Sequence, residues 1–516
     1  MKTFLNKLLE YYGITEADFD LLINEDDNLP SFLNFNKIDE ASLYLKDKIK
    51  NNAKILIYGD YDCDGIMATS IMYLTLEKLG IKPGFYIPFR EKDGYGLTIE
   101  NIDRFHQLNY DLIILVDNGI SLTNEIDYLN KLGMEALIID HHTPKDILPN
   151  AKYIIHPSVS NFGDINMSAG AVSFYFSEAL LGYTDPYLLS LASISILSDA
   201  MPMIDYNKKL VKKGLVYINE YKFPNLCLLL EKNENINEID LSMNLVPKIN
   251  AIGRLINDNN LFNIVKYFIT KDLVKIKALT FWINSVNEKR KELVKEISIN
   301  LDVTNDDPMI IEVMDINEGL TGLIANKILN EQNKAALILI EELDNKDILK
   351  GSIRTKDGFD VINAFNNIKD LLLSYGGHKN AGGIRFKKKN LEIVKQKLFE
   401  YAIEHPFIET DKKIINIGPN EVTNENYKLL IVFAPFGQDN PVPIFELSNF
   451  YTKELVFSRD RKHIITPLGI NSSLIYFNFD NNLLNYNFVN FIGTFEDNLF
   501  KNIHKAQFKV ISYYKN

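Results

Sequence analysis

Apolar and polar positions alternate along residues 53 to 142 in a pattern typical of strands that take turns with helices. Apolar runs predict strands at AKILIYGD, KPGFYIP, DLIILVDNG and EALIIDHH. Segments with apolar residues at helical spacing lie between them, at GIMATSIMYLTLEKLG, TIENIDRFHQLN and SLTNEIDYLNKLG. Strands that alternate with amphipathic helices form a parallel sheet covered on both faces. In such sheets, ligands bind at the carboxyl ends of the strands.

The pattern changes three times further along the chain. Residues 170 to about 300 are mostly of helical type and end in a long amphipathic helix. Near residue 301 the α/β alternation restarts, and after about residue 407 short aromatic and β-branched runs such as TKELVFS and SLIYFNF predict a β-barrel of the OB type. We therefore expect an N-terminal helical cap (1–45), an α/β parallel-sheet domain (46–270), a bridging helix (271–300), a second α/β domain (301–405) and an OB-type barrel (406–516).

Composition restricts the class of protein. The chain has 516 residues, too many for one ordinary domain, and its 46% of hydrophobic residues is enough to build sizeable cores. Its two cysteines, Cys63 and Cys227, offer no disulfide framework, which suits a reducing compartment. The start does not resemble a signal peptide, and the apolar run LLSLASISILS is too short to span a membrane. We expect a soluble, cytoplasmic protein.

The net charge of −12 argues weakly against a nucleic-acid partner. Binding depends on local patches, however, and residues 451–516 hold eight Lys or Arg against five Asp or Glu, a local charge of +3. The same segment is rich in Phe and Tyr. A single-stranded nucleic acid therefore remains a candidate ligand for the barrel.

Three carboxylates follow the first predicted strand, in GDYDCDG. Asp60, Asp62 and Asp64 stand at alternate positions. An Asp-Gly pair after a strand can be a simple turn, but three acids this close repel one another unless a cation lies between them. Hard divalent cations prefer such oxygen ligands. This stretch therefore predicts a metal site.

Other candidate ligands follow neighbouring strands. Asp117 ends one strand, Asp140-His141-His142 ends another, and Asp199 ends a buried helix. Asp117 and Asp199 could instead be helix caps, and Asp140 is expected to orient an imidazole. Carboxylate with imidazole suits Mn²⁺, whereas Mg²⁺ prefers oxygen alone. Enough carboxylates are present for two shared metal ions, and two-metal sites hydrolyse phosphate esters.

These motifs also resemble a known family. GDYDCDG, VDNG, DHH and SDA, in that order, resemble the four motifs of the DHH phosphoesterase superfamily, and GGHKNAGG resembles the signature of its associated second domain. The stretches YIPFREKDGYGLT, PKINAIGRL, GSIRT and FAPFGQDNPVPIF, together with the C-terminal NLFKNIHKAQFKVISYY, are similar to those of the RecJ family of single-strand-specific DNA exonucleases. The resemblance extends from about residue 35 to the end of the chain.

The resemblance implies roles for individual residues. It makes Asp62, Asp64, Asp117, His141 and Asp199 metal ligands, with Asp60 beside them and His142 either a ligand or a contact of the scissile phosphate. It makes Arg254, Arg354, Gly376, Gly377 and His378 the residues that hold substrate phosphates. Three departures stand out: Tyr58 occupies a position where many relatives have His, SDAMP is a variant of a more usual Ala-Asp pair although Asp199 remains, and Asp439 occupies a position where a small residue is common.

The function implied by the resemblance is 5′-to-3′ digestion of single-stranded DNA to 5′-mononucleotides, with two ions of Mn²⁺ or Mg²⁺, in DNA repair and recombination. It implies single-strand-binding protein and a helicase as partners, no membrane, and a monomer. Two alternatives stay open: a short-RNA or cyclic-dinucleotide phosphodiesterase of the same superfamily, and a non-catalytic scaffold that binds DNA.

Overall fold

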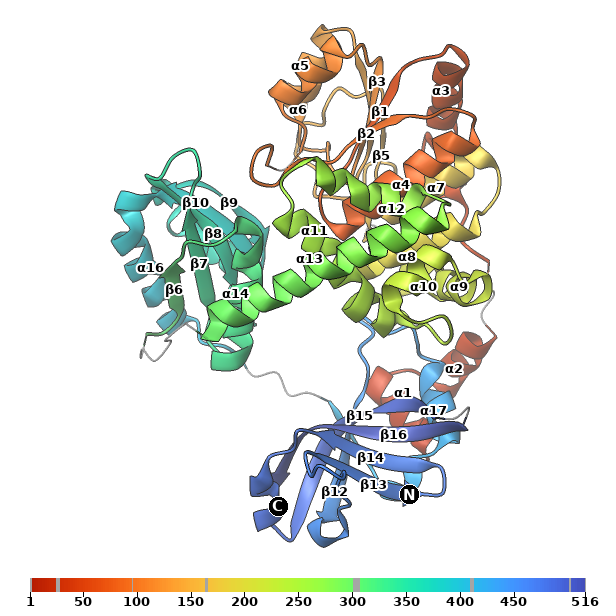
Figure 1. The fold of residues 1–516 in the computed structure, drawn as a ribbon, viewed down its shortest axis with the longest axis vertical. Helices are drawn as coiled ribbons and strands as arrows, with labels where there is room; N and C mark the ends of the chain where they lie inside the picture. Colours follow the sequence, from red (N-terminus) through yellow and green to blue (C-terminus); the bar gives the residue numbers. More distant parts are fainter. Residues whose placement is uncertain are drawn as a thin grey trace. The chain divides into compact units, whose positions relative to one another are not determined.

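The structure is a computed structural model that describes residues 2–24, 28–94, 96–162, 166–299, 307–408, 413–500 and 503–515. The chain divides into two compact units (Figure 1). One comprises Pro30–Asp199 and Lys213–Thr410, and the other comprises Met1–Leu29, Ala200–Lys212 and Asp411–Asn516. Across the described ranges, no helix is both long enough and apolar enough to cross a membrane.

The larger unit contains the predicted parallel sheet. Its strands are β1 (Ile55–Tyr58), β2 (Gly84–Tyr86), β3 (Leu112–Val116), β4 (Glu135–Ile139) and β5 (Tyr153–Ile155). They pair in the order β2-β1-β3-β4-β5, and all the pairings are parallel, as predicted. After β1 the chain moves first to one side of the sheet and then to the other. The carboxyl ends of β1 and β3 therefore flank a switch point, where α/β sheets bind ligands.

Helices surround this sheet. Three of them, α4, α7 and α8, contact one another and are buried on almost every side, because their sequences are apolar all round rather than along one stripe. The helices of this region are α3 (Ile38–Lys50), α4 (Cys63–Lys78), α5 (Ile99–Gln107), α6 (Thr123–Lys131), α7 (Ala169–Leu181), α8 (Pro186–Ser198), α10 (Pro224–Leu230), α11 (Val246–Leu255) and α12 (Asn263–Ile269).

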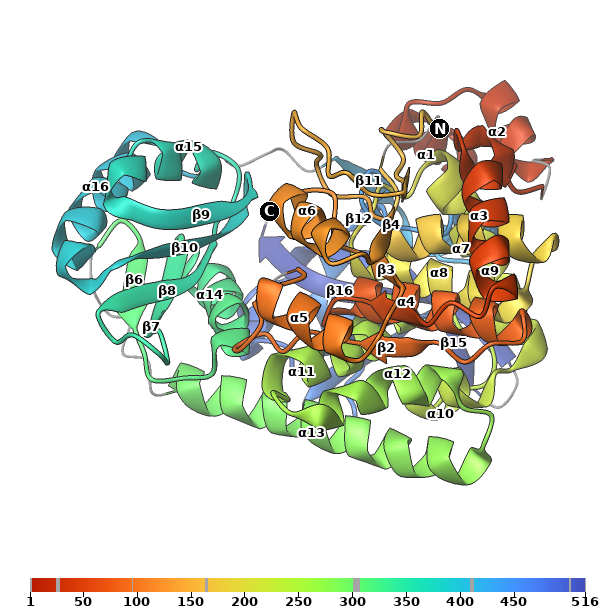
Figure 2. The ribbon, with the colours of Figure 1, turned by 90° about the horizontal axis from the view of Figure 1, so that it is seen from above.

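A long helix, α13 (Leu273–Ile299), connects this region to the second sheet (Figure 2). Its 27 residues give a length of about 40 Å. It contacts α11 on the side of the first sheet and α14 (Glu318–Gln332) on the side of the second. The predicted start of the second domain, residue 301, lies outside the described residues.

The second sheet has helices on both faces. Its strand order is β6-β7-β8-β10-β9, with β6 and β7 parallel and the other pairings antiparallel. Alternate residues of β6 and β7 face α14 on one side and α15 (Val361–Asn366) with α16 (Leu391–Glu404) on the other. The strands are β6 (Ile310–Val313), β7 (Ala336–Glu341), β8 (Ile348–Arg354), β9 (Leu372–His378) and β10 (Ala381–Lys387).

The smaller unit is built on a six-stranded sheet of order β11-β12-β15-β16-β14-β13. Two N-terminal helices, α1 (Phe4–Tyr12) and α2 (Glu16–Ile23), pack on its core, where Phe4 stacks on Phe445 and Phe495. The remaining elements are β11 (Ile414–Ile417), α17 (Asn424–Ile431), β12 (Ile444–Tyr451), β13 (His463–Gly469), β14 (Ser472–Phe477), β15 (Phe488–Phe500) and β16 (Ile503–Lys515). The division between the units passes through α9 (Asp205–Tyr221).

Two details differ from the pattern expected from the sequence. The run TKELVFS is not a strand: it opens with a helical turn at Thr452–Glu454, where the Thr452 hydroxyl donates to the carbonyl of Tyr486, and the neighbouring run Ile444–Tyr451 forms the strand instead. The expected N-terminal segment 1–45 is divided, because α1 and α2 belong to the smaller unit and α3 to the larger. The expected domain boundaries themselves stay predictions.

Candidate metal centre

The candidate ligands meet at the carboxyl edge of the parallel sheet. Asp60 follows β1, Asp117 follows β3, and Asp140 to His142 follow β4 directly. Asp199 reaches the same place as the C-terminal cap of α8. The carboxyl ends of adjacent parallel strands are neighbours, so residues far apart in the sequence converge here.

Local backbone geometry holds the acids in position. Asp62 is the N-cap of α4, and its carboxylate accepts a hydrogen bond of 3.1 Å from the amide of Gly65. A Cβ on Gly65 would lie 2.6 Å from Cβ of Asp60, so only glycine lets α4 approach the end of β1 this closely. Asp117 has a φ of 61°, in the left-handed region that non-glycine residues rarely adopt. Strain of this kind often marks a functional residue.

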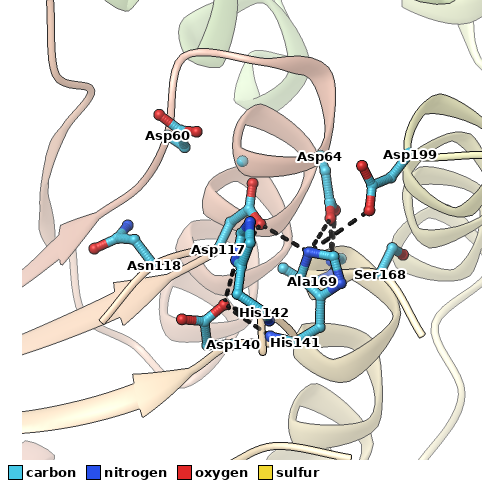
Figure 3. Close-up of polar contacts among 12 residues, drawn as sticks. Asp60, Asp64, Asp117, Asn118, Asp140, His141, His142, Ser168, Ala169 and Asp199 are labelled. Atoms are coloured by element: carbon cyan, nitrogen blue, oxygen red, sulfur yellow. Dashed lines mark hydrogen bonds and ion pairs between the residues drawn. The ribbon is translucent and has the colours of Figure 1, made fainter. Parts of the chain in front are cut away.

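The ring of His141 lies at the centre of three carboxylates (Figure 3). Its Nε2 is 3.3 Å from Oδ1 of Asp117 and 3.6 Å from Oδ2 of both Asp64 and Asp199. Asp64 and Asp117 are almost completely buried, whereas the Asp199 side chain is 35% exposed. One side of the cluster is therefore open to solvent.

Three sets of side chains have ligand atoms within 4.8 Å of one another and could each hold a metal ion. Asp117 and His141 each belong to two sets, and of the two only the Asp117 carboxylate, with its two oxygens, can be shared by two ions. The sets are Asp117 with His141 and His142, Asp64 with His141 and Asp199, and Asp60 with Asp62 and Asp117. The structure thus brings together all seven residues that the sequence proposed for catalysis.

Asp140 lies behind the cluster and orients His142. It is fully buried, and its Oδ1 accepts hydrogen bonds from Nδ1 of His142 at 2.8 Å and from the amide of His141 at 2.7 Å. Its Oδ2 accepts from the amide of Ile120 at 2.9 Å. Burial alone would raise the pKa of Asp140, but these partners outweigh it and lower the pKa. A proton on Nδ1 of His142 therefore points at Asp140, and Nε2 is the ring nitrogen that can bind a metal or a phosphate oxygen.

The other acids cannot all be charged without a cation. Burial, followed by repulsion from Asp62, raises the pKa of Asp60 to about 8. Burial, followed by repulsion from Asp64 and Asp62, raises the pKa of Asp199 to about 8. Burial and neighbouring carboxylates also raise the pKa of Asp117 well above its ordinary value. A donor set of crowded carboxylates with an imidazole fits a divalent cation.

The two histidines titrate in opposite directions. Burial lowers the pKa of His141, so this ring is neutral near pH 7, as a metal ligand must be. Burial also acts to lower the pKa of His142, but the hydrogen bond and charge of Asp140 outweigh it and raise the pKa to about 9. Before any metal binds, His142 is therefore the cationic member of the pair.

Asp64 has a support that the sequence did not reveal. Its two oxygens accept hydrogen bonds of 2.8 Å from the backbone amides of Ala169 and Gly170, at the N-terminus of α7. Ser195 of α8 adds a hydrogen bond of 2.5 Å to Oδ1 of Asp64 and also lies 2.6 Å from Ser168. The only signal in the sequence was the unusual number of serines in an otherwise apolar helix.

Two predicted phosphate-binding arginines lie against the first turns of α14. Nη1 of Arg254 donates to the carbonyl of Gly319 at 3.0 Å, and a Cβ on Gly322 would lie 2.7 Å from Nη2 of Arg354. Burial, followed by the charges of Arg90 and Arg354, lowers the pKa of Arg254 to about 10. Arginines this close at a helix N-terminus favour an anion.

The sequence reasoning missed Arg90, which stands beside both sites. Its guanidinium lies over the ring of Tyr61, 4.0 Å from the centroid. Its charge acts on Asp60 of the metal centre and on Arg254 of the arginine group. The residue lies within the stretch YIPFREKDGYGLT, which could have suggested it.

The glycine-rich motif lies on the same sheet as Arg354. Ala381 of β10 pairs with Arg354 of β8 on one side and with His378 of β9 on the other, so the three side chains share one face. His378 is exposed, two strands or about 10 Å from Arg354. Gly377 has a φ of 138°, and a Cβ there would lie 2.3 Å from the carbonyl oxygen of Ala381; at Gly376 a Cβ would meet open space.

Family models match three parts of the chain. The N-terminal domain of the DHH family matches residues 54–196, the DHHA1 domain matches residues 306–404, and the RecJ OB domain matches residues 415–512. The first covers the parallel sheet with α4, α7 and most of α8. The second covers the sheet that carries Arg354 and His378, and the third covers most of the six-stranded sheet of the smaller unit.

Curated relatives are similar over most of the chain. A single-stranded-DNA-specific exonuclease RecJ of Bacillus subtilis is 29% identical over 421 residues, which is 78% of this chain and 53% of that protein. The protein of the same name from Thermus thermophilus is 27% identical over 79% of this chain and 61% of its own length. The chain thus spans about half to three-fifths of the length of these two relatives.

A solved structure shares the fold. The crystal structure of RecJ in complex with Mn²⁺ from Thermus thermophilus superposes with a TM-score of 0.83 at 23% identity, covering 99% of this chain and 78% of that one. The chain therefore carries, in this order, segments that match the N-terminal domain of the DHH family, the DHHA1 domain and the RecJ OB domain, and it shares the fold of that solved structure.

Proposed function

We propose that this chain is a single-stranded-DNA-specific exonuclease that hydrolyses phosphodiester bonds from the 5′ end and releases 5′-mononucleotides. The observation that carries the proposal is the convergence of five aspartates and two histidines into three overlapping ligand sets at one sheet edge. The relatives named as single-stranded-DNA-specific exonucleases support the substrate.

The centre fits two divalent ions, Mn²⁺ or Mg²⁺. The predicted ligands are Asp62, Asp64, Asp117, His141 and Asp199, and Asp60 lies close enough to contribute. Bound divalent cations supply Lewis-acid polarisation of the phosphoryl group and activation of water. An imidazole among the ligands favours Mn²⁺ over Mg²⁺, and solved RecJ structures that share this fold include both a Mn²⁺ and a Mg²⁺ complex.

The histidines take different roles in this proposal. His141 is neutral and surrounded by carboxylates, so it serves as a metal ligand. His142 keeps a proton through Asp140, and its side chain is 43% exposed, so it contacts the scissile phosphate and balances its charge. Of the two roles that the family resemblance left open for His142, the raised pKa supports the phosphate contact.

Arg254, Arg354 and Arg90 hold the phosphates of the substrate. Arg254 and Arg354 lie against the first turns of α14, and the charge of Arg90 acts both on Arg254 and on Asp60 of the metal centre. Guanidinium groups bind phosphate oxygens through paired hydrogen bonds. A 5′-terminal phosphate held here sets the direction of digestion. The glycine-rich residues Gly376 and Gly377, together with His378, contact the DNA backbone beyond that phosphate.

The RecJ OB domain binds the single-stranded DNA substrate. Phe488 and Tyr514 on β15 and β16 expose 51% and 46% of their surface, and Tyr451 lies beside Phe488, with ring centroids 5.1 Å apart. Exposed aromatic rings bind single strands by stacking on the bases. The family resemblance adds the setting: DNA repair and recombination in the cytoplasm, as a monomer, with single-strand-binding protein and a helicase as partners.

The test is a digest of oligonucleotides labelled at the 5′ or the 3′ end, as single-stranded DNA, duplex DNA and RNA, with Mn²⁺, Mg²⁺ or EDTA. We expect mononucleotides to leave the 5′ end of single-stranded DNA in the presence of metal only. Equal digestion of duplex, release from the 3′ end, or activity in EDTA would each refute the proposal.

The alternatives predict other results in the same digest. A short-RNA or cyclic-dinucleotide phosphodiesterase would prefer those substrates to long DNA. A scaffold would bind DNA and cut nothing, yet every predicted acid and histidine is present and assembled. The RecJ OB domain, suited to long single strands, supports the exonuclease over the short-substrate enzyme.

A further inference from the structure

Helix α11 lies between the metal centre and the arginines that hold the substrate phosphates in the proposed function (Figure 2). It contacts α4, whose first turn carries Asp64, and α14, against which Arg254 and Arg354 lie. The two groups act on one DNA strand, so the distance between them decides whether the scissile phosphate reaches the metal ions. The element that fixes this distance therefore matters for turnover.

One face of α11 is joined to the loop that carries the metal ligands. Oδ1 of Asn250 accepts a hydrogen bond of 2.8 Å from the amide of Cys63, which stands between two of the predicted ligands. Gly253 lies three residues further along the same face. A Cβ on Gly253 would overlap the carbonyl oxygen of Tyr61, so only glycine lets α11 approach the loop this closely.

The next residue joins α11 to α14. Nη1 of Arg254 donates to the carbonyl of Gly319 at 3.0 Å, and a Cβ on Gly319 would lie 2.7 Å from Cα of Arg254. The backbones of the two helices are therefore in contact at this point. Asn250 and Arg254 are four residues apart, about 6 Å along the helix axis. A single turn of α11 thus contacts the metal-binding loop and α14 at once.

A second connection holds the start of α14 from another side. Asn317 is the N-cap of α14, and its Oδ1 accepts from the amide of Gly319 at 2.8 Å. Its Nδ2 donates to Oε1 of Glu91 at 2.8 Å, and Glu91 directly follows Arg90 in the sequence. A shift of α14 would therefore disturb its contacts with both α11 and the loop that carries Arg90.

We propose that Asn250, Gly253 and Gly319 are positioning residues that fix the distance between the metal centre and the phosphate-binding arginines. This inference rests on the proposed function. Backbone atoms make the contacts at both glycines, so no flexible side chain separates the loop from α11 or α11 from α14. Precise spacing is valuable here, because a misplacement of about 1 Å can slow a reaction about 100-fold.

Gly319→Ala tests the contact between α11 and α14, because the added methyl group forces the two helices apart. We expect kcat on 5′-phosphorylated single-stranded DNA to fall by about 10- to 100-fold. Mn²⁺ affinity, measured by calorimetry, and DNA affinity, measured by anisotropy, should be unchanged. The ratio of kcat/KM values for 5′-phosphorylated and 5′-hydroxyl DNA should also decrease, since the arginines would hold the phosphate at the wrong distance from the metal ions. A protein that is merely less stable would lose activity equally on both substrates.

Asn250→Ala tests the contact with the metal-binding loop and adds no volume. We expect its Mn²⁺ affinity to fall about 10- to 100-fold, as when a metal ligand loses a supporting partner. Asn250→Asp keeps an oxygen acceptor for the amide of Cys63 and should recover affinity relative to Asn250→Ala. Asn326→Ala is the control, because it removes an exposed amide side chain from α14, and it should match the wild type in every measurement.

Unchanged kcat and an unchanged substrate ratio in Gly319→Ala would overturn the proposal, and so would Mn²⁺ binding by Asn250→Ala that equals the wild type. If circular dichroism shows that Gly319→Ala does not fold, the two Asn250 variants decide the outcome. A wild-type protein that digests no single-stranded DNA would instead refute the proposed function. The two failures are therefore distinguishable.

Discussion

Ser195 donates a hydrogen bond of 2.5 Å to Oδ1 of Asp64, across 131 residues of sequence. The bond fixes one oxygen of a carboxylate whose rotamer is already set by the two amides at the start of α7. A carboxylate held in this way presents its remaining lone pairs in one direction. Ser195 is therefore a positioning residue for a predicted metal ligand.

We expect Ser195→Ala to weaken Mn²⁺ binding about 10- to 100-fold, the usual effect of losing a partner of a metal ligand. Isothermal titration calorimetry gives the affinity directly, without relying on turnover. Ser190→Ala is the matched control, because Ser190 lies on the same helix, is buried, and donates only to the carbonyl of Pro186. Equal affinities in the two variants would show that the Ser195 bond does not position Asp64.

Asp117 belongs to two of the three ligand sets, so its loss should disrupt both ion positions. We expect Asp117→Ala to abolish turnover while binding of single-stranded DNA survives, since the arginines and the OB domain are untouched. Asp127→Ala, which changes an exposed acid on α6, should behave as wild type. Near wild-type hydrolysis by Asp117→Ala in Mn²⁺ would mean that the metal site is assigned wrongly.

Metal binding should depend on pH in a defined direction. The pKa values of Asp60 and Asp199 are raised to about 8, so in the folded, metal-free protein these carboxyls hold protons that the unfolded chain, with aspartate pKa values of 3.8, releases. The stabilisation by these protons is complete below the unfolded pKa and is lost as the pH rises through about 8.

A divalent cation competes with those protons, so we expect Mn²⁺ affinity to increase between about pH 6 and pH 8. Calorimetry in two buffers of different ionisation enthalpy should show protons released on binding. The melting temperature of the metal-free protein should fall over the same range, and Mn²⁺ should offset the fall. A flat pH profile with no proton release would contradict the raised pKa values.

The convergence of several candidate ligands could be predicted from the sequence by one topological rule, whereas their role as metal ligands stays a prediction. Residues that follow successive parallel strands, such as Asp60, Asp117 and His141, share a sheet edge whatever the details of packing. The bond between Ser195 and Asp64 was not predictable, because it depends on how α8 packs on α4. Likewise, α1 was expected in a cap, yet Phe4 stacks on Phe445, far away in the sequence.

The OB domain can be tested by point variants better than by deletion. A chain that ends near residue 405 would leave Phe4 and Leu8 of α1 without the core on which they pack. We expect Phe488→Ala with Tyr514→Ala to cost about 1–3 kcal/mol per lost stacking contact on long single strands. Cleavage of short oligonucleotides should be unchanged. Undiminished affinity for long strands, measured by anisotropy, would exclude these rings from DNA binding.

Arg354 gives the sharpest test of the direction of digestion. Its guanidinium lies against Gly322 of α14, in a group with Arg254. Burial lowers the pKa of Arg354, so this charge lies away from bulk water and a bound anion would stabilise it. We expect Arg354→Ala to weaken DNA binding with little dependence on base sequence. It should also lower the salt slope by roughly one phosphate contact.

The loss in kcat/KM should be greater for 5′-phosphorylated than for 5′-hydroxyl DNA, because only the phosphate forms a charge-assisted hydrogen bond with the guanidinium. Arg354→Lys should restore the charge but not the paired geometry, so its loss should lie between those of the wild type and Arg354→Ala. The measurements are a salt titration of binding and kinetics on the two 5′ ends. An unchanged salt slope with equal losses on both substrates would show that Arg354 does not bind a substrate phosphate. Arg254 and Arg90 would then be the arginines that set the direction of digestion.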